Sequence, residues 1–235
     1  MKSKLKKTIA LVLVGGSGER FGKEKQFVLA LNRPLMSFAI EELGLSPYID
    51  EIVLVGKKGT LNKTLEIGKA YANNKLKAVI EGGKTRQESS YKGVKFLIDS
   101  GFSSNSIVLI QDGDRPNITQ EMIKENVESA KINKAAVTAI KEPNSVFISN
   151  NDYKVNSYLD RNEIYEAQTP QTFELGLIYK AHLKGDKRKG ISDDASLVRL
   201  LKKDVAIVPG GKNNIKINYV SDLNYFEYIK GGLNR

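Results

Sequence analysis

Glycines and cations that could bind phosphate follow the first apolar run of the chain. Residues 9–14 are apolar throughout, the sequence GGSGER occupies residues 15–20, and Lys25 follows. Glycines let backbone N–H groups approach phosphate oxygens with no Cβ in the way. The spacing matches neither a Walker A box nor the G-x-G-x-x-G motif, and a plain tight turn explains the glycines alone about as well. Arg20 and Lys25 favour a polyphosphate site, because both would lie beside the bound phosphates.

Two carboxylates close another apolar run. Asp112 and Asp114 follow the sequence SIVLIQ at 106–111, and Arg115 and Pro116 come next. Mg²⁺ or substrate hydroxyls would explain carboxylates at the end of a buried strand better than packing does. Asp-Gly followed by Arg-Pro is also good turn chemistry. The coincidence of two Asp, an Arg and a rigid Pro favours a functional site.

Three more stretches carry polar residues at places where a site could form. The sequence EGGKTRQES at 81–89 and Lys216 each accompany a predicted strand. In SDDASL at 192–197, Ser192 predicts a helix N-cap and the two Asp residues after it favour the positive end of that helix. Taken by themselves, the residues of SDDASL indicate only the start of a helix.

The chain contains one His and no Cys. This composition excludes disulfides, thiolate nucleophiles and Cys-ligated metals, and it fits a reducing compartment such as the cytoplasm. His182 lies in a predicted helix with no partner nearby in sequence, so we expect it at the surface or half-buried. Nucleotidyl transfer suits such a chain, because it relies on positioning and charge stabilisation. A phosphate monoester acting as nucleophile is already mostly ionised at neutral pH, since its second pKa is about 6.

Short apolar runs alternate with amphipathic stretches along most of the chain, which is typical of βαβ units. Runs that are apolar at every position predict a mostly parallel α/β sheet with helices on both faces, within one domain spanning 1–235. Ligands of such sheets bind beyond the carboxyl ends of the strands. Strands are predicted at 9–14, 51–56, 77–83, 106–111, 135–140, 205–209 and 214–218. Helices are predicted at 34–45, 60–73, 85–100, 119–132, 174–184, 193–203 and 221–231, with Pro34 and Thr119 at helix starts.

The net charge of +10 over 235 residues is typical of a protein with an anionic partner such as nucleic acid, a phospholipid surface or a phosphorylated small molecule. Lys and Asn are frequent along the whole chain, however, which favours a general drift in composition over a dedicated nucleic-acid patch. No basic run is interleaved with aromatic residues, so we do not expect nucleic acid as a partner. No apolar segment approaches the length needed to cross a bilayer. The basic N-terminus before residues 9–14 resembles a secretory signal, but the short apolar run and the glycines after it predict a first strand.

Six separated motifs resemble the 2-C-methyl-D-erythritol 4-phosphate cytidylyltransferase family and its sister family, the ribitol-5-phosphate cytidylyltransferases. They are LVGGSGERF with KQF, EGGKTRQES, DGDRP, DRNEIYEAQTPQTF, SDDASL and NIKI, in that order between residues 8 and 232. The resemblance implies a Rossmann-like nucleotidyltransferase fold with a projecting β-arm that clasps a second subunit. It also implies that CMP is transferred from CTP to a polyol phosphate with Mg²⁺ present. The departure from the helical rhythm at about 141–166 is where that β-arm is expected.

The resemblance also implies a role for individual residues. Around CTP it implies Leu13, Val14, Gly15, Gly16 and Gly18 at the phosphates, Gly82, Gly83 and Ser89 at the cytosine, and Arg86 at the nucleotide. Around the reacting groups it implies Arg20 and Lys25 at the α-phosphate of CTP. It implies Asp112 and Arg115 at the metal or the substrate, with Asp112 as the metal ligand. Arg161 and Lys216 would contact the substrate phosphate, and Ser192 and Asp193 would line the same cleft. Arg161 would reach the neighbouring subunit, and Arg20, Lys25, Arg161 and Lys216 would be the catalytic residues.

The chain departs from the family pattern at three places. Family members usually have a small residue where Asp114 stands and an acidic residue where Lys84 stands, and the interval from Arg20 to Lys25 is two residues shorter than usual. LDRNEIY and SDDASL favour methylerythritol phosphate over the alternative, ribitol 5-phosphate, as the acceptor. A non-catalytic nucleotide- or nucleic-acid-binding protein is the alternative outside this class.

Overall fold

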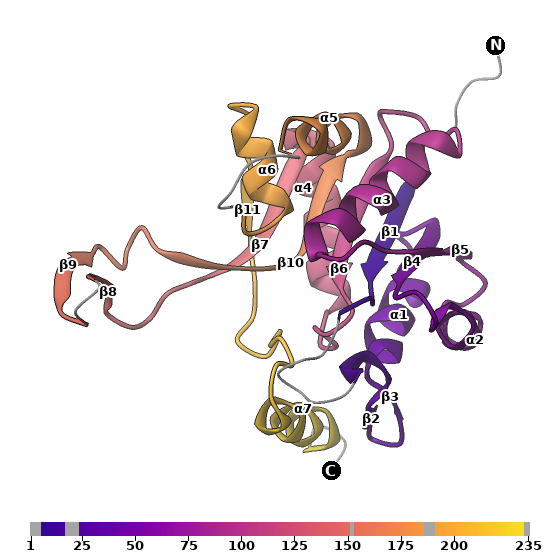
Figure 1. Ribbon diagram of the computed structural model, residues 1–235, viewed down its shortest axis with the longest axis horizontal. Coiled ribbons are helices and arrows are strands. Elements are labelled where there is room, and N and C mark those ends of the chain that lie inside the picture. The colour runs from indigo at the N-terminus through magenta and orange to yellow at the C-terminus, as the bar shows by residue number, and fades with distance from the viewer. Residues whose placement is uncertain (1–5, 17–23, 151–152, 186–190, 233–235) are drawn as a thin grey trace.

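A seven-stranded sheet, parallel in most of its pairings, forms the centre of the molecule (Figure 1). The computed structural model describes residues 6–16, 24–150, 153–185 and 191–232. The strand order is β11-β7-β10-β6-β1-β4-β5, and only β10 runs antiparallel to its neighbours. The strands are β1 (Thr8–Leu13), β4 (Glu51–Gly56), β5 (Leu76–Glu81), β6 (Ile107–Asp112), β7 (Ala135–Lys141), β10 (Tyr165–Glu174) and β11 (Ala206–Pro209). The predicted α/β class is confirmed.

Helices cover both faces of this sheet (Figure 1). One core lies between the sheet and α3 (Arg86–Asp99), α5 (Leu175–Gly185) and α6 (Asp194–Leu200). The other core lies on the opposite face, against α1 (Leu35–Leu45), α2 (Leu61–Tyr71) and α4 (Gln120–Asn133). Alternate residues of β1 enter the two cores, because successive side chains of a strand point to opposite faces. The continuous apolar runs in the sequence are therefore explained by burial on both sides.

A smaller unit beside the main sheet holds the segments that approach the site. The 3₁₀ helix η2 (Lys25–Phe27) leads into the short strands β2 (Leu29–Ala30) and β3 (Arg33–Pro34). The last helix, α7 (Val220–Gly232), packs here through an edge-to-face contact in which the rings of Phe38 and Phe226 are 4.9 Å apart. The same core includes Val28 after Lys25 and Ile215 and Ile217 around Lys216, so it positions the chain next to both lysines.

The segment between β7 and β10 projects from the body as a β-arm (Figure 1). Its tip is a two-stranded antiparallel sheet of β8 (Val146–Ser149) and β9 (Val155–Leu159). Apolar side chains of this arm are exposed to solvent, among them Phe147, Ile148, Val155 and Tyr158. The structure confirms the predicted arm, and the described residues of the single chain leave these side chains uncovered.

Two details of the sequence prediction are wrong. Residues 214–218 form no strand; the segment instead runs past the end of β6, where the Ile217 N–H donates to the Asp114 carbonyl at 2.9 Å. Residues 165–174 form a full strand of the central sheet, which the prediction assigned largely to the arm and the loop after it. Pro34 is the N-cap residue of α1 and Thr119 is that of α4, so both helices start where the sequence predicts.

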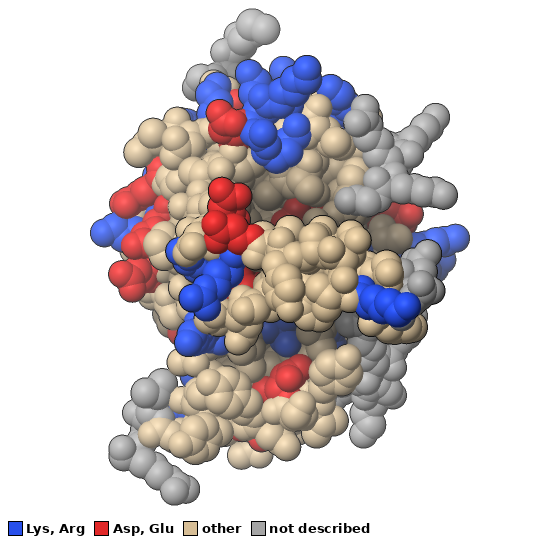
Figure 2. All heavy atoms as spheres, turned by 90° about the vertical axis from the view of Figure 1, so that its left-hand side faces the viewer, with Lys and Arg blue, Asp and Glu red and all other residues tan. Residues whose placement is uncertain are grey.

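The surface carries both signs of charge. On the face shown in Figure 2, basic and acidic side chains are interspersed, with large uncharged areas between them. The net charge of +10 is therefore not gathered into one continuous patch on that face. Within the described parts of the chain, each helix is too short or too polar to cross a bilayer.

Candidate active site

A cavity of about 230 Å³ lies where the carboxyl ends of β1 and β6 meet. Leu13 pairs with Asp112 in the sheet, so the glycines after β1 and the carboxylates after β6 reach the same edge. β1 is flanked by β4 on one side and β6 on the other, which is the switch point where α/β sheets bind ligands. The cavity is lined by Leu13, Gly15, Gly16, Gly83, Lys84, Thr85, Arg86, Ser89, Asp112, Asp114 and Lys216.

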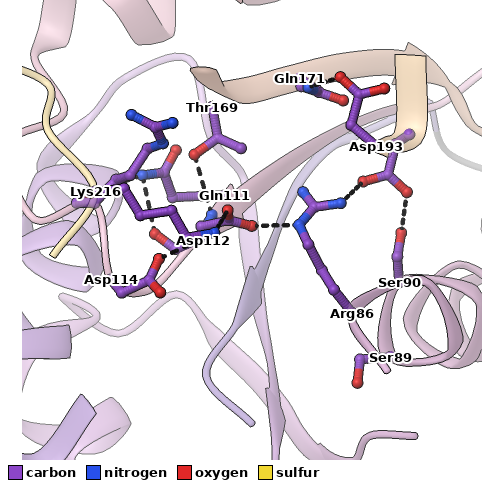
Figure 3. Close-up of polar contacts among 12 residues, drawn as sticks. Arg86, Ser89, Ser90, Gln111, Asp112, Asp114, Thr169, Gln171, Asp193 and Lys216 are labelled. Atoms are coloured by element: carbon purple, nitrogen blue, oxygen red, sulfur yellow. Dashed lines mark hydrogen bonds and ion pairs between the residues drawn. The ribbon is translucent and has the colours of Figure 1, made fainter. Parts of the chain in front are cut away.

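Asp112 is held between two cations inside this cavity (Figure 3). The Arg86 Nε donates to Asp112 Oδ1 at 2.8 Å, and the Lys216 Nζ donates to Asp112 Oδ2 at 2.8 Å. Burial alone would raise the pKa of the Asp112 carboxyl, but the charges of Arg86 and Lys216 outweigh burial and lower that pKa. Asp112 is therefore a carboxylate at neutral pH, ready to accept further donors or a cation.

Asp114 carries the second carboxylate and pairs with Lys25. The Lys25 Nζ lies 2.6 Å from Asp114 Oδ2 and also donates to the Ile217 carbonyl at 2.8 Å. The other oxygen, Asp114 Oδ1, lies 3.7 Å from the Lys216 Nζ. Three cationic and two carboxylate side chains thus meet at the end of β6, which gives the cavity the charges needed to hold a polyphosphate.

Arg86 extends this network into the protein interior. Its Nη1 donates to Asp194 Oδ2 at 2.8 Å, and the Ser90 hydroxyl donates to Asp194 Oδ1 at 2.5 Å. The His182 Nε2 lies 3.2 Å from the Ser90 Oγ and 3.4 Å from Asp194 Oδ1. Burial would raise the pKa of the Asp194 carboxyl, but the Arg86 charge and the contacts with His182 and Ser90 hold it well below its usual range. The two carboxylates in turn raise the pKa of Arg86, against the effect of its burial.

Backbone groups supply the remaining face of the cavity. A Cβ built on Gly16 would meet no atom of the described residues within 4 Å, and Gly16 lines the cavity. Gly113 is different: a Cβ there would lie 2.5 Å from a Val14 methyl carbon and 3.1 Å from the Leu13 carbonyl oxygen. The Gly113 N–H donates to that carbonyl at 2.9 Å, so a residue without a side chain lets β1 and the end of β6 approach closely.

The N-terminus of α3 points its positive end at this region. Thr85 caps the helix by accepting from the Glu88 N–H, and both Thr85 and Arg86 line the cavity. The Ser89 hydroxyl accepts from the Gly83 N–H at 3.0 Å and donates to the Thr85 carbonyl at 2.9 Å. A helix N-terminus beside two cation-bearing loops favours an anionic ligand.

Comparison with known proteins identifies the family to which these motifs belong. The family model described as 2-C-methyl-D-erythritol 4-phosphate cytidylyltransferase matches residues 8–231. A relative of that name from Thermosipho africanus is 37% identical over 95% of this chain and 99% of its own length. Another, from Alkaliphilus oremlandii, is 34% identical over 96% of this chain and 95% of its own. The chain belongs to this family.

A solved structure supports the same conclusion. The 4-diphosphocytidyl-2C-methyl-D-erythritol synthase of Anaerococcus prevotii has a TM-score of 0.83 and 28% sequence identity, covering 98% of this chain and 97% of that one. This cytidylyltransferase is therefore an enzyme that uses CTP, as the motifs predicted. The alternative of a non-catalytic binding protein is left without support.

The cytidylyltransferase fold brings most of the predicted residues together, but not all of them. Leu13, Gly15, Gly16, Gly83, Arg86, Ser89, Asp112 and Lys216 line the cavity. Lys25 reaches Asp114 at its edge. Gly82 is buried, and its N–H donates to the Gly56 carbonyl at 2.8 Å. Gly18 and Arg20 lie outside the described residues.

Two predicted residues have a structural role in this chain. The Val14 side chain packs in the core that α1, α2 and α4 share with the sheet, and its N–H donates to the Val55 carbonyl at 2.9 Å. Arg115 is buried, and its guanidinium donates to the carbonyls of Asn214 and Ala167 at 2.7 Å and 3.4 Å. Burial lowers the pKa of Arg115. Its side chain ties the 214–218 segment to β10 rather than lining the cavity.

The SDDASL motif borders a second cavity next to the first. Ser192, Asp193, Asp194, Thr85 and Arg86 are among the residues around this space of about 270 Å³. The prediction that Ser192 caps the helix is wrong: Asp193 is the N-cap of α6, in a capping box with Ser196. Asp193 also accepts from the Gln171 Nε2 at 2.8 Å (Figure 3), which fixes the motif against β10.

Arg161 lies on the arm and is not among the residues that line the cavity of its own chain. It is exposed in the turn between β9 and β10, and its carbonyl accepts from the Ile164 N–H at 3.4 Å. No side-chain partner of Arg161 is found among the described residues. The prediction that it serves a neighbouring subunit is compatible with this position.

Sequence reasoning missed the buried partners of Arg86. His182 is 2% exposed and lies in the Ser90–Asp194 network, so the prediction of a surface or half-buried residue is wrong. Asp194 was interpreted as a favourable helix-start charge, whereas it is 1% exposed and paired with Arg86. The one available signal was the doubled Asp in SDDASL, because a capping box needs only the first of them.

Proposed function

We propose that this cytidylyltransferase transfers CMP from CTP to 2-C-methyl-D-erythritol 4-phosphate and releases pyrophosphate, in the cytoplasm, as a homodimer. The observation that carries the proposal is the meeting of Lys25, Lys216 and Arg86 with two carboxylates in a cavity beside the glycines after β1. The names of the relatives support the methylerythritol acceptor over ribitol 5-phosphate. The absence of cysteine supports a reducing compartment.

The reaction needs charge stabilisation rather than a strong base. A phosphate oxygen of the acceptor attacks the α-phosphorus of CTP, a P–O bond forms, and the bond to the pyrophosphate leaving group breaks. The acceptor phosphate is already mostly ionised at neutral pH, since its second pKa is about 6. Lys25, together with Arg20, is proposed to stabilise the charge that develops on the α-phosphate, and Lys216 is proposed to hold the acceptor phosphate.

The carboxylates of the cavity fit a magnesium ion. No group of three or more acidic or histidine side chains is clustered for a metal among the residues that the structure describes. Mg²⁺ does not need one, because one or two carboxylates and substrate phosphates usually hold it together with water. Asp112 and Asp114 both line the cavity, and the buried Asp114 Oδ1 accepts no hydrogen bond. We propose Asp112 as the residue that would hold the metal, which when bound neutralises charge on the triphosphate.

The arm supports a dimer. Its tip exposes Phe147, Ile148, Val155 and Tyr158 on a two-stranded sheet, and an isolated hairpin of this kind is marginal in water. Pairing with the arm of a second chain would cover these side chains and the strand edges. A closed two-fold dimer is the commonest arrangement that achieves this. Arg161 of one chain would then reach the active site of the other.

Release of pyrophosphate from CTP tests the proposed function directly. We expect release with 2-C-methyl-D-erythritol 4-phosphate and Mg²⁺, and markedly less with ribitol 5-phosphate or without an acceptor. The same assay with UTP, ATP or GTP in place of CTP tests whether the enzyme is specific for the cytosine base. Faster turnover with ribitol 5-phosphate would assign the chain to the alternative acceptor. If none of the polyol phosphates tested leads to release of pyrophosphate, the proposal is contradicted.

A further inference from the structure

Asp114 holds the ammonium of Lys25 from two directions. Its Oδ2 lies 2.6 Å from the Lys25 Nζ. Its backbone carbonyl accepts from the Ile217 N–H at 2.9 Å, and the Ile217 carbonyl accepts from the same Lys25 Nζ at 2.8 Å. Asp114 therefore supplies one partner of the ammonium and fixes the residue that supplies the other.

A lysine at this position needs such support. Lys25 lies on η2, a helix of three residues, and its side chain crosses to the end of β6. Fixing a lysine side chain costs up to about 2 kcal/mol of conformational entropy. A carboxylate partner with its own side chain 16% exposed holds the ammonium at the cavity before any ligand arrives.

The same carboxylate opposes the binding of a polyphosphate. Asp114 lines the cavity, and its charge would repel an anion there. Asp114 also pairs with the Lys25 ammonium and lies 3.7 Å from the Lys216 ammonium. These two ammonium groups are the cations that a phosphate would contact. Removal of the Asp114 charge therefore has two opposite effects. It leaves the Lys25 side chain less ordered, which slows the transfer, and it makes the cavity more positive, which strengthens the binding of CTP.

We propose that Asp114 is a positioning residue that sets Lys25 for nucleotidyl transfer at the expense of CTP affinity. This inference rests on the proposed function, in which Lys25 stabilises charge on the α-phosphate. Asp114 differs in this respect from Asp112, whose two oxygens face Arg86 and Lys216 rather than Lys25. The family usually has a small residue at position 114. Positioning of Lys25 would explain why this chain has a carboxylate there.

The first test separates kcat from KM. Asp114→Asn keeps the size of the side chain and removes its charge. We expect kcat to fall between ~10-fold and ~100-fold, because misplacement of a catalytic group by about 1 Å has effects of that size. We expect the KM and the calorimetric Kd for CTP to fall roughly threefold or more, because a repulsive charge is gone. Asp114→Glu restores the charge and should recover part of kcat.

A double-mutant cycle decides whether Asp114 acts through Lys25. If it does, the loss of kcat caused by Asp114→Asn disappears in a Lys25→Ala background. An equal loss in both backgrounds would overturn the proposal. A loss of kcat that excess Mg²⁺ restores would also overturn it and make Asp114 a metal ligand instead.

A spectroscopic test is independent of the reaction. In protein labelled with ¹⁵N-lysine, the Lys25 ammonium should give a resolved NH₃⁺ signal, assigned by its absence in Lys25→Arg, and Asp114→Asn should remove or broaden that signal. An unchanged signal would overturn the proposal. Asp99→Asn is the matched control, because Asp99 forms a 2.5 Å surface pair with Lys95 on α3 and should leave the Lys25 signal and kcat as they are. If the wild-type enzyme is inactive, the proposed function is wrong. The NH₃⁺ signal would still show whether Asp114 holds the Lys25 ammonium.

Discussion

Arg86 and Asp194 form an ion pair that joins the active-site cavity to the buried start of α6. The pair has a 2.8 Å contact, and the Asp194 side chain is 1% exposed. Arg86 uses its Nε for Asp112 at the same time, so one guanidinium orders both carboxylates. The position of Asp112 in the first cavity consequently depends on Asp194, which does not line that cavity.

Asp194→Ala should destabilise the enzyme and reduce its activity. Removal of one partner of a buried ion pair leaves the other charge without compensation, which costs about 3 kcal/mol or more. We expect the low end of that range, because Arg86 is partly exposed and retains Asp112. Urea unfolding measures the loss. Ser90→Ala is the control, since it removes one hydrogen bond to Asp194 and leaves the ion pair intact; an equal loss in both variants would show that the ion pair adds nothing.

The stability of the fold should depend on pH through the same carboxyl. The pKa of Asp194 is held well below its value in the unfolded chain, which is about 3.9. A depressed pKa stabilises the folded state fully above the unfolded value, and this contribution is lost as the pH falls towards the folded value. We therefore expect the free energy of unfolding to fall more steeply from pH 5 to pH 3 in the wild type than in Asp194→Asn. Parallel curves for the two proteins, measured at equal ionic strength, would contradict the assignment.

Lys25→Ala should lower kcat far more than it raises the KM for CTP. A preorganised donor to developing charge is worth about 2.7–4 kcal/mol, which is a loss of roughly 100- to 1000-fold in kcat. We expect the same direction for Arg20→Ala, whose role comes from the sequence motif alone. Steady-state pyrophosphate release measures both constants. Turnover within a few-fold of the wild type would show that Lys25 and Arg20 do not have these roles. Lys95→Ala on the surface is the control for loss of a cation.

The sequence predicted the parallel part of the fold well because burial there leaves a plain signature. β1, β4 and β6 are apolar at nearly every position, and each contacts helices on both sides. β10 lacks that signature: it contains Gln168, Thr169, Pro170 and Gln171, and a Pro usually argues against a central strand. Buried polar groups of this strand find partners from distant parts of the chain, for example where the Thr138 hydroxyl donates to the Pro170 carbonyl at 2.7 Å.

The site was predictable where its residues adjoin a strand end and not where they meet across the chain. Asp112 and the glycines were found because ligands gather beyond the carboxyl ends of parallel strands, whereas Lys216 adjoins no strand and was found through the family motif. Asp194 contacts Ser90 across 104 positions of sequence, and Arg115 contacts Asn214 across 99. Local patterns contain no information about such pairs, so His182 appeared to have no partner and Arg115 appeared to face a ligand.

Gly16→Val should weaken CTP binding without affecting the fold. A Cβ at Gly16 meets no atom of the described residues within 4 Å, so a larger side chain would occupy the space of the cavity rather than displace the protein. We expect the Kd for CTP, measured by calorimetry, to rise at least ~10-fold while thermal unfolding stays close to that of the wild type, because a side chain would lie where a phosphate approaches the backbone. Gly232→Val is the control, since that position also meets open space but lies at the end of α7. Unchanged affinity in a folded Gly16→Val protein would show that the glycines after β1 form only a turn.

The composite site proposed for the dimer can be tested by mixing two inactive variants. Arg161 is exposed on the arm, while Lys25 pairs with Asp114 at the cavity. If each active site takes Arg161 from one chain and Lys25 from the other, a dimer of one Arg161→Ala chain and one Lys25→Ala chain has one intact site. Random pairing makes half of the dimers mixed, so roughly a quarter of wild-type activity should return. Subunit exchange has to be verified with differently tagged chains.

Truncation of the arm tip gives the complementary result. Replacement of residues 146–159 by a short Gly-Ser turn removes the exposed apolar strands and retains the cavity, and it should produce a monomer by light scattering with little activity. Substitution of Phe147 and Tyr158 by Ser is the milder control, because these rings contact each other edge to face with centroids 6.0 Å apart and are largely exposed in the single chain. Their loss should weaken dimerisation while leaving monomer stability nearly unchanged. If exchange is verified and no activity returns on mixing, or if the truncated monomer is fully active, Arg161 acts within its own chain or outside the reaction.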